Sequence, residues 1–180
     1  MCTMKHPILI LSILSMFIIA CASVPITGRR QLNLIPQTQL LSTSFQQYDS
    51  FMAEHNPSDD REHAQMVRQV GERIQGAVER YFIQHNLSAR LQGYEWEFNL
   101  VKSREVNAWC MPGGKVVVYE GILPIARDEA GLAVVMGHEI AHAVAEHGNE
   151  RMSQGLLTQL GGLALSEALE QKPETTRQLW

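Results

Sequence analysis

The sequence predicts an α+β fold that is mainly helical, with a small antiparallel sheet just before the helix at residues 129–146. Several segments carry apolar residues at three- and four-residue spacing, which is typical of helices that bury one face. Another segment alternates strictly between apolar and polar residues, as a half-buried strand does. Helices are expected at residues 38–55, 58–84, 129–146 and 151–170, and strands at 94–101, 106–110 and 115–119.

The first 20 residues are set apart from the rest of the chain. Lys5 precedes an apolar run from Ile8 to Ala20 that is interrupted only by two serines. This run is shorter than the roughly 20 apolar residues that a membrane-spanning helix needs, but it suits the core of a signal peptide. Residues 1–20 are therefore predicted to be a signal peptide.

The end of this run, residues 18–21, resembles a bacterial lipobox, with an aliphatic residue three before a cysteine and a small residue just before it. The resemblance implies cleavage before Cys21 and lipid attachment to its sulfur. Ala22, where an inner-membrane lipoprotein would have Asp, favours the outer membrane. The alternatives are an ordinary signal peptide and an uncleaved anchor. Cys110 would then be the one free thiol of the mature chain, and its strand position favours a small buried hydrophobic residue.

Breakers and caps set the remaining boundaries. Residues 21–36 read as an irregular leader with prolines and a glycine, and residues 37–180 as one domain. Ser58 is expected to cap the second helix, and Asp128 the helix at 129–146. Tyr94, Trp96, Phe98 and Leu100 should share the buried face of the first strand. A Pro-Gly-Gly turn at 112–114 should join the next two strands. Gly148 is expected to end the helix at 129–146.

The stretch His138-Glu139-Ile140-Ala141-His142 carries the chemistry. Positions four apart share one face of an α-helix, so the two imidazoles can reach one ion. Glu139 stands beside them, where its carboxylate can hold a water molecule. This is the H-E-x-x-H pattern of zinc peptidases. The alternative is a buried helix whose histidines are hydrogen-bonded core residues.

Several stretches around this motif resemble one family. They are residues 106–109 (VNAW), 112–114 (PGG), 117–119 (VVY) and the leader at 24–32 (VPITGRRQL). Together they are similar to the HtpX-like and CAAX-prenyl-endopeptidase-like zinc metallopeptidases, in their periplasmic lipoprotein branch. The resemblance covers most of residues 21–154.

This resemblance implies a zinc-dependent endopeptidase with one zinc ion per chain. His138 and His142 would be metal ligands, and Glu139 the general base. The strand around Asn107 and Ala108 would be an edge that pairs with an extended substrate, although Asn107 also suits a turn at a strand end. The implied substrates are unfolded or misassembled envelope proteins, met in the periplasm by a protein that its lipid holds to the membrane. No basic stripe favours nucleic acid as a partner.

The family also has a third ligand, a glutamate on a later helix, and no matching motif occurs before Trp180. Glu146 lies about 12 Å along the helix from His138, too far for a shared ion if the helix stays straight. Glu167 and Glu170 do not stand in the family setting. The chain is therefore expected to be an N-terminal fragment. The alternative is a catalytically inactive lipoprotein with a chaperone or scaffolding role.

Overall fold

The computed structural model describes residues 21–24 and 28–170, so the predicted signal peptide lies outside the described residues. Contacts divide the chain into two units. The central unit contains Ser23–Arg29 and Pro36–Gly148, and the terminal unit contains Met1–Ala22, Arg30–Ile35 and Asn149–Trp180. The predicted domain boundaries at residues 20 and 36 stay predictions.

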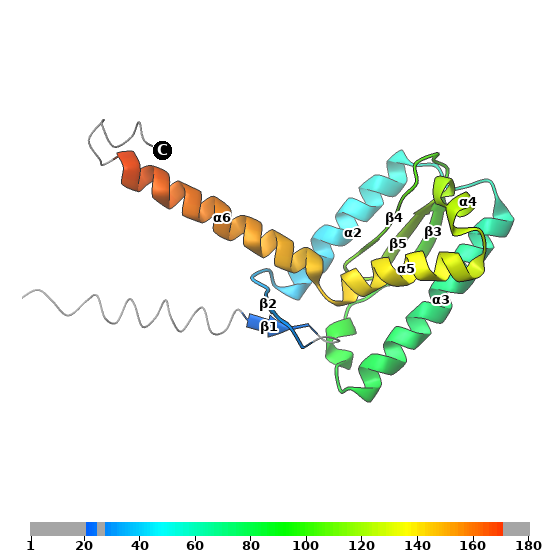
Figure 1. Ribbon diagram of the computed structural model, residues 1–180, viewed down its shortest axis with the longest axis horizontal. Helices are drawn as coiled ribbons and strands as arrows, with labels where there is room; N and C mark the ends of the chain where they lie inside the picture. The colour runs from blue at the N-terminus through cyan, green and yellow to red at the C-terminus, as the bar shows by residue number, and fades with distance from the viewer. Residues whose placement is uncertain (1–20, 25–27, 171–180) are drawn as a thin grey trace, which may run out of the picture. The chain divides into compact units, whose positions relative to one another are not determined.

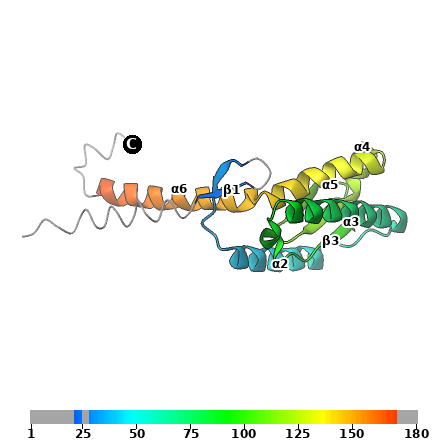
Figure 2. The same cartoon turned by 90° about the horizontal axis from the view of Figure 1, so that it is seen from below.

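The central unit is a three-stranded sheet between helices (Figures 1 and 2). The strands are β3 (Glu97–Val101), β4 (Ala108–Met111) and β5 (Lys115–Tyr119). Helix α2 (Gln37–Glu54) covers one face, and α3 (Arg61–Gln84) with α5 (Glu129–Val144) covers the other. Short helices are η1 (Ser88–Leu91), η2 (Glu120–Ile122) and α4 (Leu123–Ala126).

The α+β class is confirmed, but the sheet is mixed rather than wholly antiparallel. Its order is β3-β5-β4, with β4 antiparallel and β3 parallel to β5. All five residues of β5 are buried. A strand that is buried on both faces must be covered on both sides, so β5 takes the centre. The Pro-Gly-Gly turn is confirmed, and Gly113 and Gly114 have φ of 94° and 87°, as a tight hairpin turn requires.

Two boundaries differ from the prediction. The predicted Ser58 cap is wrong, because the Asp60 side chain accepts the His63 backbone N–H at 3.1 Å and caps α3 from Arg61. Ser58 instead donates its hydroxyl to Glu120. The first strand begins at Glu97 rather than at residue 94.

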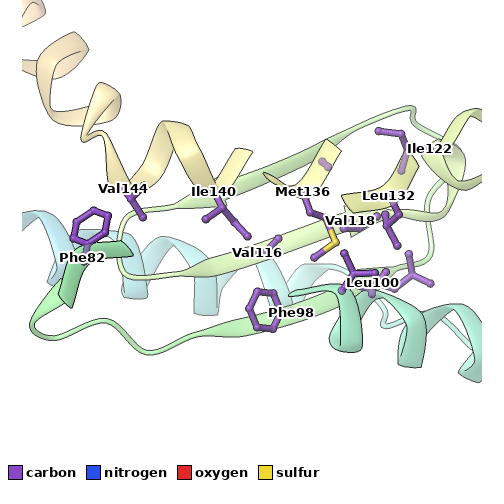
Figure 3. Packing of buried hydrophobic residues seen from close by; sticks show 13 residues of the cluster. Phe82, Phe98, Leu100, Val116, Val118, Ile122, Leu132, Met136, Ile140 and Val144 are labelled. Atoms are coloured by element: carbon purple, nitrogen blue, oxygen red, sulfur yellow. The ribbon is translucent and has the colours of Figure 1, made fainter. Parts of the chain in front are cut away.

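The main core lies between the sheet and the α3–α5 layer (Figure 3). Leu132, Met136 and Ile140 are at most 1% exposed. They pack with Phe98 and Val116 of the sheet. The predicted face of Tyr94, Trp96, Phe98 and Leu100 is confirmed in this cluster. A smaller cluster on the α2 side gathers Tyr48, Val101, Val117 and Tyr119. The helix that carries the histidines is thus fixed to the sheet by its apolar face.

Helix α3 approaches the sheet closely at Gly71, where an added Cβ would lie 2.2 Å from the Phe98 ring. We expect Gly71→Ala to lower the free energy of unfolding by about 1–3 kcal/mol, as overpacking does. At Gly76 of the same helix, the nearest atom to an added Cβ is the flexible end of Arg80 at 3.3 Å. Gly76→Ala should therefore raise the free energy of unfolding by up to about 1 kcal/mol. Urea unfolding of both variants measures the difference, and equal effects would contradict the packing argument.

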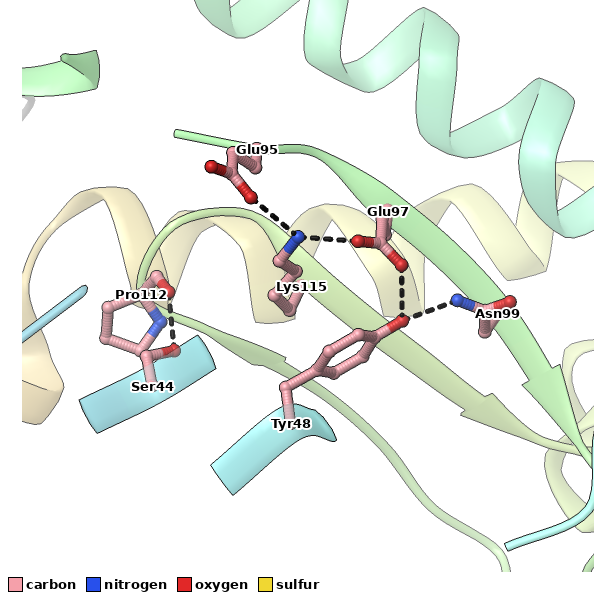
Figure 4. A network of polar contacts seen from close by, with 7 residues as sticks. All are labelled: Ser44, Tyr48, Glu95, Glu97, Asn99, Pro112 and Lys115. Atoms are coloured by element: carbon pink, nitrogen blue, oxygen red, sulfur yellow. Dashed lines mark hydrogen bonds and ion pairs between the residues drawn. The ribbon is translucent and has the colours of Figure 1, made fainter. Parts of the chain in front are cut away.

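A polar network lies on the α2 side of the sheet (Figure 4). Lys115 is 4% exposed and its ammonium lies 2.6 Å from Glu97 and 3.4 Å from Glu95. The Tyr48 hydroxyl donates to Glu97 at 3.0 Å and accepts from Asn99 at 2.6 Å. Burial opposes the charged form of Glu97, but the hydrogen bonds from Lys115 and Tyr48 outweigh it and hold its pKa below the ordinary value. The buried ammonium is thus matched by a carboxylate that stays ionised.

This network makes stability depend on pH. A carboxyl whose pKa is lower in the folded state stabilises the fold above its unfolded pKa, and that contribution is lost as pH falls through the folded value. We therefore expect the free energy of unfolding to decrease as the pH is lowered below about 4.5, the ordinary pKa of a glutamate. Glu97→Gln should flatten this slope in urea titrations at stepped pH. Glu95→Gln, at a carboxylate that is 67% exposed, should keep it.

The terminal unit joins the leader to the last helix. β1 (Cys21–Ser23) and β2 (Arg30–Leu32) form a two-stranded sheet. In α6 (His147–Glu170), buried Asn149 donates to the Ile35 carbonyl at 2.8 Å, and buried Ser153 accepts the Leu34 N–H at 2.8 Å. The predicted helix at 151–170 is confirmed, with an earlier start. Within residues 21–24 and 28–170, no helix has the length and apolar character needed to span a membrane.

Candidate metal centre

Helix α5 is built by its cap and its apolar stripe. The Asp128 side chain accepts the Gly131 N–H at 2.9 Å, as predicted for an N-terminal cap. Leu132, Met136, Ile140 and Val144 recur every four residues and are buried. His138 and His142 lie on the opposite face and are exposed. The alternative of buried core histidines is therefore wrong.

The two imidazoles face each other across one helical turn. Their Nε2 atoms are 3.0 Å apart and their ring centroids 4.5 Å apart. Two nitrogens that bind one tetrahedral zinc ion at its usual bond lengths stand about 3.3 Å apart. Two bare nitrogens at this distance would repel, and either an N–H···N hydrogen bond or a shared cation removes that repulsion. The pair therefore fits a zinc ion.

Glu139 lies between the two histidines in sequence and is half-buried, on a helix that packs against β4. Burial raises the pKa of the Cys110 thiol in β4, and the Glu139 carboxylate adds to the shift because a thiolate beside it would be a like charge. This coupling places the carboxylate near β4. The predicted reading of Cys110 as a strand residue is confirmed.

Among the described residues, no group of three His, Cys, Asp or Glu side chains is arranged so that it could hold one metal ion. Glu146 pairs with Arg90 at 3.6 Å instead of turning to the histidines. The side chains of Glu167 and Glu170 lie outside the described residues. A third ligand beyond Trp180 stays a prediction.

The turn after α5 brings a third histidine to the site. The helix ends at Val144, so the prediction that Gly148 ends it is wrong. Glu146 takes φ of 58°, a left-handed conformation that costs a non-glycine residue about 1–2 kcal/mol. The next residue, His147, turns back so that its Nδ1 lies 2.6 Å from the Nδ1 of His142. Sequence reasoning missed His147, because residues five apart on a continuous helix do not share a face.

Strand β4 forms an open edge beside α5. Within the described residues its one strand neighbour is β5, whereas the outer side of β3 is partly covered by residues 56–58. The Tyr119 N–H donates to the Asn107 carbonyl at 3.1 Å. In an antiparallel pair the bonded residues alternate, so the backbone groups of Ala108 and Cys110 face away from β5. Ala108 is thus at the free edge, and the backbone carbonyl of Asn107 is not.

Comparison with known proteins gives the family of the chain. The family model described as Peptidase family M48 matches residues 68–177, which include the whole of α5 and β4. The metalloendopeptidase OMA1, mitochondrial, of Bos taurus is 32% identical over 130 residues, covering 72% of this chain and 24% of the bovine protein. The mitochondrial metalloendopeptidase OMA1 of Arabidopsis thaliana is 42% identical over 72 residues, 40% of this chain and 15% of that protein.

A bacterial relative is also similar. The beta-barrel assembly-enhancing protease of Escherichia coli is 36% identical over 52 residues, 29% of this chain and 11% of that protein. The matched part of this chain thus spans less than a quarter of each of these three relatives. Because the family match covers more than half of the chain, the protein belongs to peptidase family M48.

Proposed function

We propose that the protein is a zinc-dependent endopeptidase. The observation that carries the proposal is the pair of exposed imidazoles with Nε2 atoms 3.0 Å apart. An open strand edge on the neighbouring β4 supports it. Membership of a metallopeptidase family supports it. His138 and His142 would hold the ion, with a third ligand from outside the described residues.

In this proposal the chain supplies proton transfer and orientation. A bound zinc ion would polarise the scissile carbonyl and acidify the attacking water. The Glu139 carboxylate accepts the proton of that water and returns it to the leaving amine, so the proton count balances. The apolar face of α5 keeps Glu139 at a fixed distance from β4, because Met136 and Ile140 anchor the helix to the sheet.

The free edge of β4 would bind the substrate backbone as an added strand. Backbone pairing reads little sequence, which suits extended polypeptides of many kinds. We therefore propose unfolded or misassembled envelope proteins as substrates, and the name of the E. coli relative supports this class. Lipid on Cys21 would hold the protein to the periplasmic side of the outer membrane. Loss of the membrane fraction in Cys21→Ala would be the expected sign of that anchor.

The substrate edge gives a prediction of its own. We expect Ala108→Pro to lower kcat/KM for casein by about 2- to 10-fold, because it removes one outward N–H worth roughly 1 kcal/mol in hydrogen bonding. The sheet should survive, since proline is tolerated at an edge whose N–H does not pair with a neighbouring strand. Trp109→Pro is the contrast, because its N–H faces β5 and its loss should unfold the sheet. Unchanged kcat/KM in a folded Ala108→Pro protein would argue against this edge.

The central test combines metal content with hydrolysis. Purified protein should contain zinc, cleave casein, lose cleavage with a chelator and regain it with added zinc. His142→Leu should lose the zinc and the cleavage together. Cleavage that survives chelation would overturn the proposal. Suppression of aggregation by a protein that never cleaves would instead support a chaperone role.

A further inference from the structure

We propose that His147 is a positioning residue that fixes the tautomer and the ring orientation of His142; this inference rests on the metal centre of the proposed function. The three rings form a chain. His138 and His142 meet through their Nε2 atoms at 3.0 Å, and His142 meets His147 through their Nδ1 atoms at 2.6 Å. Each of the two ring nitrogens of His142 thus faces a nitrogen of another histidine.

The contact between His142 and His147 has one proton in it. Two bare nitrogens at 2.6 Å would repel, and so would two N–H groups, so one ring donates and the other accepts. If His147 donates, His142 keeps its proton on Nε2 and points an N–H at His138. That form has no lone pair for an ion between the two rings.

If His142 donates, the opposite holds. Its Nδ1 carries the proton, its Nε2 is bare, and the lone pair points toward His138. Metal-binding histidines commonly donate their second N–H to a neighbouring acceptor, which raises ligand basicity and fixes the ring. In most such pairs the acceptor is a carboxylate or a carbonyl. Here the Nδ1 of His147 takes that place.

The backbone is shaped for this contact. Helix α5 stops at Val144, and Glu146 adopts φ of 58°, which turns the chain sharply before His147. The Glu146 carboxylate lies 3.6 Å from Arg90, and both side chains are about three-quarters buried. His147 is half-buried and its ring centroid lies 4.8 Å from that of His142 at 64°. A continued helix would carry the two rings apart, so the strained turn is what brings them together.

Zinc affinity of the 180-residue chain, measured by competition with a chromophoric chelator, tests this role. His147→Phe keeps the ring but has no acceptor, and we expect it to weaken zinc binding by about 10- to 100-fold. His147→Asn places an amide oxygen near the position of Nδ1 and should recover most of the affinity. His85→Phe is the matched control, since His85 is exposed and its Nδ1 contacts the Tyr81 carbonyl at 2.7 Å rather than another histidine, and it should bind as the original chain does.

A second readout does not need the metal. Nitrogen-15 spectra of the histidine rings in metal-free protein should show His142 with its proton on Nδ1, and His147→Phe should shift His142 toward the Nε2–H form. Unchanged affinity and an unchanged tautomer in His147→Phe would overturn the inference, as would a His147→Asn protein no better than His147→Phe. A parent chain that binds no zinc overturns the proposed metal centre, and the spectra then decide the orienting contact on their own.

Discussion

Glu139→Gln is expected to lower kcat for casein cleavage by about 100- to 10,000-fold, the range that a positioned general base supplies. The amide keeps the shape of the side chain but cannot take a proton from water. Zinc content should be unchanged, because the two imidazoles that face each other at 3.0 Å remain. Single-turnover cleavage and metal analysis of the same sample measure both quantities.

The control for this variant lies on the same helix. Glu129 is in the first turn of α5, pairs with Arg73 and is 51% exposed, far from the histidines along the helix axis. Glu129→Gln should therefore cleave casein at the parent rate. Equal cleavage by Glu139→Gln and the parent protein would remove Glu139 from the mechanism while leaving the family assignment intact.

Met136→Ala should lower the free energy of unfolding by about 2–5 kcal/mol, the usual cost of a large-to-small change in a packed core. Met136 is fully buried between α5 and the sheet, among Phe98, Leu100 and Val118 (Figure 3). This is a large share of the roughly 5–15 kcal/mol that holds a domain folded. Urea unfolding followed by circular dichroism measures the loss.

A surface position on the same helix serves as its comparison. Val134 is 73% exposed, so Val134→Ala should change the free energy of unfolding by no more than about 0.5 kcal/mol. Equal losses in the two variants would mean that α5 does not depend on its buried face. The site would then need another explanation for its fixed distance from the sheet.

The sequence predicted the helix of the metal motif well, because cap, stripe and histidine spacing all agree there. Asp128, the buried stripe and the exposed histidines appear where these local signals place them. The hairpin turn at Gly113 and Gly114 was equally predictable, since glycine is the residue that such a turn requires. Local chemistry decided each of these features.

What the sequence did not reveal depends on contacts between distant residues. The parallel pairing of β3 with β5 follows from the burial of β5 on both faces, which periodicity alone cannot distinguish from a one-sided strand. His147 was missed because its contact with His142 needs a left-handed residue at Glu146, where glycine would be the expected signal. The Asp60 cap was missed because Ser58 has a distant partner in Glu120.

The groups that the structure describes at the candidate site come from one continuous stretch, residues 107–147. Its pieces meet over short sequence separations, which favours fast local assembly of this part of the chain. The same stretch is tied to the rest of the unit through α5 against α3 and β5 against β3. Amide protons across the hairpin and the motif helix should therefore exchange with solvent as a single cooperative block. The catalytic groups would then come together and separate in one unfolding event.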